Sequence, residues 1–231
     1  MKKFILIPFG ILYIIFFCSC SGDTMGTNDN PPPSITLKTV TAAGNPANPY
    51  DGIGQNFTAM LSAYKDSDYD PSAFEDIAMI VRILTKQTET ESELLQAEQL
   101  LSLCISHPYD TSASLLGQSE LSPQARDITG DLVGNFETLG NQSFDVSYGA
   151  LVNMEDTVTA SAILSLQEKR VILTLASVIR YSLYHSCCED TDWEKSVGNI
   201  VAALAGILED DSLATAYPVA TSIAGLEKIE F

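Results

Sequence analysis

Basic residues are scarce in this chain of 231 residues. It has 12 Lys and Arg against 30 Asp and Glu, which gives a formal net charge of −18. Binding to a phosphate backbone requires clustered basic side chains, so this composition argues against a nucleic-acid partner. Hydrophobic residues are not scarce: they make up 45% of the chain, far more than an acidic disordered chain carries. The chain is therefore expected to fold around a hydrophobic core.

The sequence also lacks the common catalytic motifs. It contains no P-loop, GxGxxG, HExxH, GxSxG or paired CxxC motif. Only two histidines exist: His107 stands beside Pro108, and His185 lies in an aromatic segment. We expect a helix-end or core role for both, because neither has the neighbours that a Ser-His-Asp hydrolase would need. The sequence thus favours a protein that is not an enzyme, and it indicates no catalytic residue.

The N-terminus has the pattern of a secretory signal. Lys2 and Lys3 precede an apolar run from Phe4 to Phe17. As a helix this run would span roughly 21 Å, which is short of the ~30 Å hydrocarbon core of a bilayer. A cleaved signal is therefore expected here, and a permanent membrane span is not.

The end of this run, Phe17-Cys18-Ser19-Cys20, resembles the corresponding site of bacterial lipoprotein precursors, although Leu is commoner than Phe at the first position. The resemblance implies that residues 1–19 are a lipoprotein signal peptide. It also implies that Cys20 carries the lipid, palmitate-type acyl chains included, because Cys18 would place bulky Phe17 where a small residue is preferred. Ser21 is similar to the residue that directs many Gram-negative lipoproteins to the outer membrane. The resemblance does not decide between the periplasmic face and the surface face of that membrane. Removal of Lys2 and Lys3 with the signal would change the formal net charge from −18 to −20.

Composition divides the remaining chain into two parts. Residues 20–49 are rich in Pro, Gly, Asn and Thr and include the run Pro31-Pro32-Pro33, so they are predicted to form a flexible tether. After Tyr50 the hydrophobic residues recur with helical spacing, and residues 50–231 are predicted to form one all-α domain of about eight helices.

Capping signals suggest where these helices begin. The expected starts are near Ile53, at Asp70-Pro71, at Thr90 with Glu93, at Ser122-Pro123, at Ser147, at Ser165 with Glu168, at Trp193 and at Asp211-Ser212. We predict a loop from Pro108 to Leu121, a short helix from Ser147 to Met154 and a kink at Pro218. The stretch from Ile200 to Leu208 is apolar on every side, which is typical of a central core helix.

Asp66, Asp68 and Asp70 alternate along a short segment, as the first ligands of a Ca²⁺ loop do. In the register of an EF-hand, however, Pro71 replaces the glycine and Ile77 replaces the bidentate glutamate. Two interpretations remain. The three residues form a simpler Ca²⁺ site, assisted by Glu75 or Asp76, or they are acidic residues gathered at a helix N-terminus.

Three cysteines remain in the predicted domain: Cys104, Cys187 and Cys188. In an exported protein a disulfide from Cys104 to one of the adjacent pair is the first expectation. The second is a Zn²⁺ or Cu⁺ site that combines these cysteines with His107 and His185. Buried free thiols are the third. No cofactor is predicted beyond these metal ions.

Two further segments carry a weaker resemblance. Asn48-Pro49-Tyr50-Asp51-Gly52-Ile53-Gly54-Gln55-Asn56, and distantly Ser165 to Lys169 followed by Arg180-Tyr181-Ser182, resemble parts of uncharacterised helical proteins that bacteria export or anchor by lipid. The histidine usual near Asn56 is absent, and the resemblance implies no activity. Locally, Asp51 and Gly52 predict a turn before the first helix.

The function that these patterns favour is a lipid-anchored, non-enzymatic domain that binds a protein or small molecule in the bacterial cell envelope. One alternative is a metal-dependent or cysteine-dependent envelope enzyme. The other is an immunity or inhibitor lipoprotein whose acidic surface neutralises a basic toxin.

Overall fold

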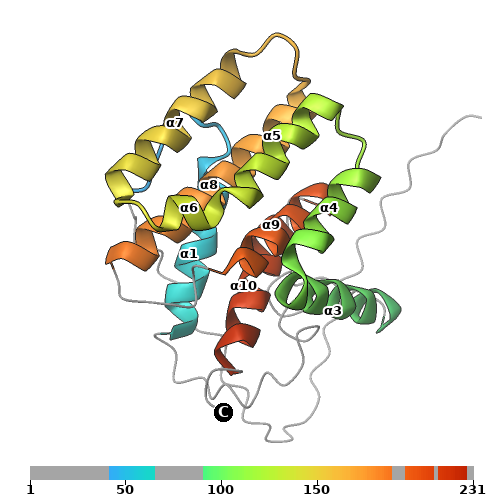
Figure 1. The fold of residues 1–231 in the computed structure, drawn as a ribbon. Coiled ribbons are helices and arrows are strands. Elements are labelled where there is room, and N and C mark those ends of the chain that lie inside the picture. Colours follow the sequence, from blue (N-terminus) through green and yellow to red (C-terminus); the bar gives the residue numbers. More distant parts are fainter. Residues whose placement is uncertain (1–41, 66–90, 189–195, 211–212, 228–231) are drawn as a thin grey trace, which may run out of the picture. The chain divides into compact units, whose positions relative to one another are not determined.

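The computed structural model describes residues 42–65, 91–188, 196–210 and 213–227, all within one compact unit (Figure 1). These residues form nine α-helices and no strand, which confirms the predicted all-α class. The helices are α1 (Asp51–Lys65), α3 (Glu91–Ser106), α4 (Pro108–Gln118), α5 (Pro123–Gly134), α6 (Phe136–Gly140), α7 (Phe144–Ala160), α8 (Leu166–Cys188), α9 (Val197–Glu209) and α10 (Leu213–Glu227). The helix predicted from Asp70-Pro71 lies outside the described residues.

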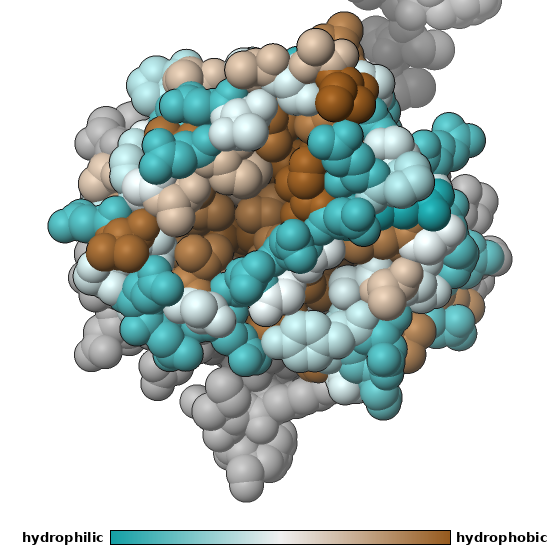
Figure 2. All heavy atoms as spheres, turned by 45° about the horizontal axis from the view of Figure 1, so that its top comes forward, coloured by the Kyte–Doolittle hydropathy of each residue, from teal (hydrophilic) through white to brown (hydrophobic). Residues whose placement is uncertain are grey.

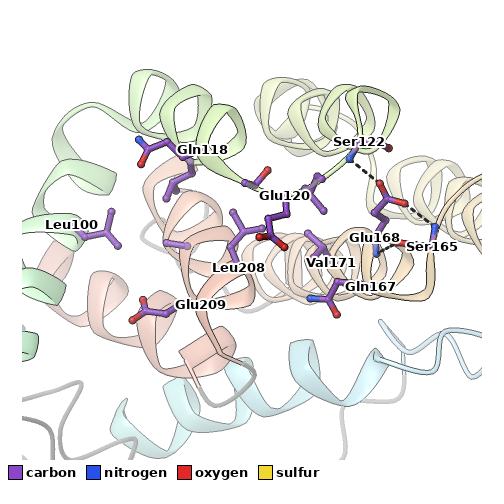
Figure 3. A pocket seen from close by; sticks show the side chains of 14 residues that line it. Leu100, Gln118, Glu120, Ser122, Ser165, Gln167, Glu168, Val171, Leu208 and Glu209 are labelled. Carbon is purple, nitrogen blue, oxygen red and sulfur yellow. Dashed lines mark hydrogen bonds between the residues drawn. The ribbon is translucent and has the colours of Figure 1, made fainter.

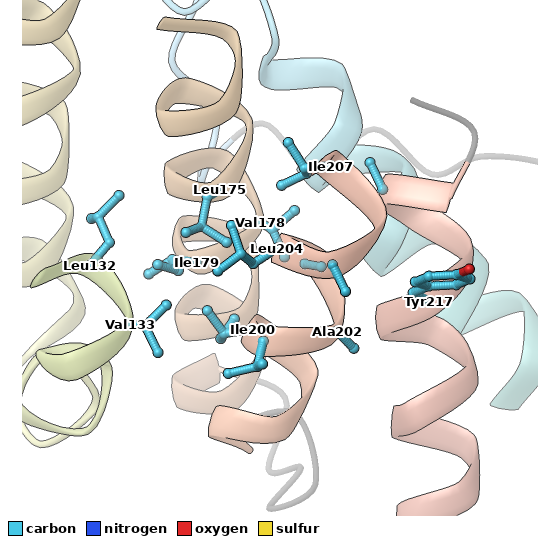
Figure 4. Packing of buried hydrophobic residues seen from close by; sticks show 14 of the residues in the cluster. Leu132, Val133, Leu175, Val178, Ile179, Ile200, Ala202, Leu204, Ile207 and Tyr217 are labelled. Carbon is cyan, nitrogen blue, oxygen red and sulfur yellow. The ribbon is translucent and has the colours of Figure 1, made fainter. Parts of the chain in front are cut away.

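Two helices form the centre of the fold. All residues from Val171 to Leu183 of α8 are buried, and so are all residues from Val197 to Ile207 of α9. Helix α8 contacts α1, α5, α6, α7 and α9, whereas α9 contacts α3, α4, α5, α8 and α10. Figure 4 shows side chains of α5, α8 and α9 packed together between these three helices. The prediction of a central core helix over 200–208 is confirmed.

Most predicted helix starts are close to the observed ones. The Ser122 hydroxyl accepts a hydrogen bond from the Ala125 amide at the start of α5, and the Ser196 hydroxyl accepts one from the Gly198 amide at the start of α9. Ser165 and Glu168 form the predicted capping box: the Glu168 amide donates to Ser165 Oγ at 3.2 Å, and the Ser165 amide donates to Glu168 Oε2 at 2.7 Å.

Two predictions about local structure are wrong. The segment from Pro108 is not a loop but helix α4, with Pro108 in the first turn, where its missing N–H costs nothing. The helix expected from Ser147 begins earlier, at Phe144, and continues to Ala160. In addition, apolar residues recur with helical spacing from Ala125 to Leu139 and predict one helix that ends near Gly140, but the structure divides this segment at Asn135 into α5 and α6.

Pro218 lies inside α10, and the kink predicted there stays a prediction. No helix among the described residues is long and apolar enough to cross a membrane.

Candidate functional site

A cavity among the described residues lies where four segments meet. The end of α4 and its connection to α5 form one side, and the start of α8 and the end of α9 form the others, with Leu100 contributed by α3 (Figure 3). Its volume is about 750 Å³. Pockets that bind small molecules commonly occupy about 300–1,000 Å³, so a ligand of ordinary size would fit. We refer to this cavity as the α4–α9 pocket.

The floor of the α4–α9 pocket is apolar. It is lined by Leu100, Leu115, Leu121, Val171, Ala205 and Leu208. Polar lining residues surround this floor: Gln118, Ser119, Glu120, Ser122, Ser165, Gln167, Glu168 and Glu209. An apolar floor with a few polar groups at its margin is the usual composition of a site that binds small molecules.

Glu168 joins two helix starts at the margin of this pocket. Its Oε1 accepts a hydrogen bond from the Ser122 amide at 2.8 Å, and its Oε2 accepts one from the Ser165 amide at 2.7 Å. Ser122 and Ser165 immediately precede α5 and α8, whose N-termini favour a negative charge. The hydrogen bonds from Ser122 and Ser165 lower the pKa of Glu168 to about 2. Its carboxylate therefore stays ionised, and both of its oxygens accept hydrogen bonds from the backbone at the two helix starts.

The other two carboxylates that line the pocket have different surroundings. Glu209 is exposed and accepts a hydrogen bond from the Tyr217 hydroxyl at 3.0 Å. Glu120 is also exposed, and Figure 3 shows its carboxylate directed toward Leu208 and Val171, over the apolar floor. None of the described residues that line the pocket is a Lys or an Arg.

A second, smaller hollow of about 390 Å³ lies among α5, α6 and α7. Its apolar lining comprises Ile128, Leu132, Leu139, Ala150, Leu151 and Met154. Figure 2 shows hydrophobic side chains gathered in a hollow on this side of the molecule. With only Asp131, Asn135 and Thr138 as polar lining residues, this hollow offers little to orient a ligand.

A buried ionic cluster lies where α8 contacts α1 and α7. The side chain of Arg180 is fully buried; its Nη2 lies 2.5 Å from Asp51 Oδ1 and 3.1 Å from Glu155 Oε1. Arg180 Nη1 donates to the Ala43 carbonyl, and the guanidinium lies within 6 Å of the ring centres of Tyr148 and Tyr181. Every nitrogen of this guanidinium therefore has an acceptor.

The same cluster fixes the residues that precede α1. Asn45 and Asn48 each donate to the Glu155 carboxylate, at 2.6 and 2.8 Å, and the Tyr148 hydroxyl donates to the Gly44 carbonyl at 2.8 Å. The Tyr181 hydroxyl donates to Asp51 Oδ2 at 3.1 Å, and burial together with the Asp51 charge raises the pKa of Tyr181 to about 12. Because its polar groups are buried and bonded to one another, we assign this cluster to structure rather than to ligand binding.

The structure places three of the residues singled out from the sequence. His107 is exposed at the N-cap of α4, but its side chain makes no cap hydrogen bond, and Nδ1 lies 2.9 Å from Ser106 Oγ. His185 is buried in α8, in agreement with a core role. Cys104 carries a free thiol that is buried in α3, and burial raises its pKa to about 12.

The other predicted site residues are not placed. Cys20 and the acidic residues Asp66, Asp68 and Asp70 lie outside the described residues, as do the side chains of Cys187 and Cys188. Within the described part of the chain, no three His, Cys, Asp or Glu side chains are grouped as a metal site requires. The lipidation and metal predictions therefore stay predictions, whereas Cys104 forms no disulfide in the structure, which agrees with the third expectation of a buried free thiol.

Sequence reasoning missed the ionic cluster, although one signal for it exists. Arg180 is the only charged residue between Val171 and Tyr184, and a charge inside an apolar helix requires a buried partner. The two segments of the weaker resemblance supply that contact, since Asp51 belongs to the first and Arg180 to the second. The α4–α9 pocket has no such signal, because its lining comes from separate segments.

Comparison of the chain with protein-family models, with curated proteins and with solved structures finds no match.

Proposed function

We propose that this chain is a lipid-anchored protein of the bacterial cell envelope whose helical domain binds a ligand in the α4–α9 pocket without transforming it. The observation that carries the binding role is the pocket itself, with its volume of about 750 Å³ and its apolar floor. The motivation for the location is the sequence around Cys20, which resembles a lipoprotein processing site.

The surroundings of the pocket favour binding over catalysis. Among the described residues, neither histidine lines it, and the titratable lining groups are Glu120, Glu168 and Glu209. Glu168 is held ionised by two backbone amides, so it is poorly suited to accept or deliver a proton near neutral pH. The remaining lining groups are amides, hydroxyls and aliphatic side chains, which fit and orient a ligand.

A ligand-capture experiment tests this proposal. The chain from residue 21, which retains the compact unit Ser34–Phe231, is incubated with a Gram-negative envelope extract, repurified and weighed by native mass spectrometry. Gln118→Trp places a large side chain at the margin of the pocket, and Gln124→Trp makes the same change at an exposed position of α5 that does not line it.

We expect wild type and Gln124→Trp to retain the same added mass and Gln118→Trp to lose it. Retention by all three proteins would locate binding elsewhere and reject the pocket. The absence of any retained mass on wild type would count against the binding role itself.

The two alternative functions have no specific support from the geometry. A cysteine-dependent or metal-dependent enzyme would rest on Cys187 and Cys188, whose side chains are not described. An immunity or inhibitor role would rest on the overall acidic charge, which indicates the sign of a partner and not its kind.

A further inference from the structure

We infer that the ligand of the α4–α9 pocket is a cationic amphiphile, a small molecule with an apolar chain and an ammonium or guanidinium head. This inference rests on the proposed function, because it names the chemical class of ligand for the same pocket. Glu120 is assigned as the group that faces the cationic head, and the apolar floor receives the chain.

The apolar part of the ligand follows from the floor. Six aliphatic side chains, from α3, α4, the α4–α5 connection, α8 and α9, line a continuous cavity. Leu121 and Val171 are buried, whereas Leu100, Leu115 and Leu208 are partly exposed to the cavity. A ligand chain that covers these three leucines would remove apolar surface from water, which favours binding.

The sign of the head group follows from which charges are already occupied. Glu168 is bonded to the amides of Ser122 and Ser165, and Glu209 accepts from Tyr217, so both carboxylates already have donors. Within the described part of the chain, Glu120 forms no hydrogen bond or ion pair, and its side chain extends over the floor (Figure 3). An anionic ligand would meet this carboxylate without a compensating cation, whereas a cationic head would be attracted to it.

Two arginines lie near the pocket, and their hydrogen bonds matter for this argument. Arg126 Nη2 donates to the Ser119 carbonyl at 2.6 Å, and Arg170 Nη2 donates to the Ile207 carbonyl at 3.0 Å. Arg170 Nε also donates to Gln167 Oε1 at 3.1 Å, so both guanidinium groups bond to residues that line the cavity, although neither arginine is itself a lining residue. They weaken the local negative potential but leave Glu120 as the charge that faces a ligand.

Calorimetric titration with three probes of equal chain length tests the inference. Decyltrimethylammonium, decanoate and decyl maltoside, each below its critical micelle concentration, are titrated into the chain from residue 21 in low-salt buffer. We expect decyltrimethylammonium to bind most tightly, and we expect its affinity to fall when the ionic strength is raised to about 0.15 M.

Two isosteric variants locate the charge that matters. Glu120→Gln should weaken binding of decyltrimethylammonium by up to about fivefold, the upper end of the range expected for an exposed ion pair, and should leave decyl maltoside unaffected. Glu137→Gln removes the same charge from an exposed position of α6 outside the pocket, and it should bind like wild type.

Equal affinity for the three probes, or an equal effect of Glu120→Gln and Glu137→Gln, would overturn the inference. So would the absence of binding by any probe. If the capture experiment still finds a ligand that Gln118→Trp excludes, the proposed function stands and only the ligand class is wrong.

Discussion

Arg180 is a permanently charged side chain with no exposed surface, so its burial must be compensated within the protein. Two carboxylates and the Ala43 carbonyl provide that compensation. The cluster joins α8 to α7 through Glu155 and to the start of α1 through Asp51. One residue of the central helix thereby determines how the chain enters the domain.

Replacing Arg180 by Met should destabilise the fold strongly. The variant leaves the fully buried Glu155 carboxylate with only the amides of Asn45 and Asn48, and a loss of about 3–5 kcal/mol in the free energy of unfolding is expected. Urea unfolding measures the loss, and Arg170→Met on the same helix is the matched control. Arg170 is partly exposed, so loss of its hydrogen bond to the Ile207 carbonyl should lower the free energy of unfolding by only about 1 kcal/mol.

Addition of Glu155→Gln to Arg180→Met should recover part of the stability, because it removes the uncompensated charge. Equal losses of unfolding free energy in Arg180→Met and Arg170→Met would show that the ionic cluster does not stabilise the fold.

Glu168 should make stability depend on pH in the acid range. Its folded pKa is lowered to about 2 from an ordinary 4.5, so its contribution is complete above about pH 4.5 and is lost as the pH falls toward 2. Glu168→Gln should therefore be less stable than wild type near neutral pH, by about 1 kcal/mol, as for loss of a helix cap. The difference should shrink below about pH 4.

Urea unfolding of wild type and Glu168→Gln across this pH range measures that difference. Glu137→Gln, which is exposed on α6, controls for the loss of one negative charge. A difference that is constant down to about pH 2.5 would mean that the Glu168 charge contributes nothing to stability.

At the scale of helices, α1 and α8 approach each other closely because one of them presents a glycine. A Cβ atom at Gly54 would lie 2.5 Å from Ser177 Oγ and 2.6 Å from the Ser177 carbonyl oxygen. Ser177 Oγ in turn accepts from the Gly54 amide and donates to the Asp51 carbonyl. The two helices are therefore joined by hydrogen bonds that require this short separation.

Gly54→Ala should force α1 and α8 apart and lower the free energy of unfolding by about 1–3 kcal/mol. Gly52→Ala, two residues earlier in the same helix, is the control because a Cβ atom there meets open space. Alanine favours helix over glycine, so Gly52→Ala should be neutral or stabilising by up to about 1 kcal/mol. Thermal unfolding compares the two variants, and equal stability would contradict the close approach.

The sequence predicts a helix well where the residues that the helix buries are apolar. The prediction fails where the buried residues are polar. Helix α8 begins at a capping box and α9 is apolar on all sides, so both were predictable. Helix α4 buries Thr111 and Ser112, whose hydroxyls donate to the carbonyls of Leu103 and Tyr109, so its inward face shows no hydrophobic periodicity. A polar residue can be buried when it is hydrogen-bonded, and no local pattern reveals the bond.

The pocket could not be predicted for a related reason. The capping box predicts that Glu168 bonds to Ser165, but its second bond is to Ser122, which is 46 positions away in the sequence. Such a contact depends on how α5 packs beside α8. The ion pair of Arg180 with Asp51, 129 positions apart, depends likewise on the packing of α1 against α8.

At the scale of the whole molecule, the proposed function requires that the binding domain be held at a membrane through the N-terminus. None of the described helices is long and apolar enough to span the membrane. The residues between Cys20 and the compact unit that begins at Ser34 are rich in Pro, Gly and Asn, the composition from which the sequence predicts a flexible tether. The acidic domain would be repelled by anionic headgroups, which makes a lipid anchor the more necessary for attachment.

Substitution of the two neighbouring cysteines separates this anchor from an ordinary cleaved signal. Cys20→Ser expressed in a Gram-negative host should lose incorporation of labelled palmitate and leave the membrane fraction on processing, whereas Cys18→Ser should keep both. If the signal is instead cleaved without lipidation, neither variant differs from wild type and none of the three proteins takes up label. Label lost only in Cys18→Ser would move the anchor to Cys18, with bulky Phe17 directly before it. The assignment of residues 1–19 as the signal peptide would then be wrong.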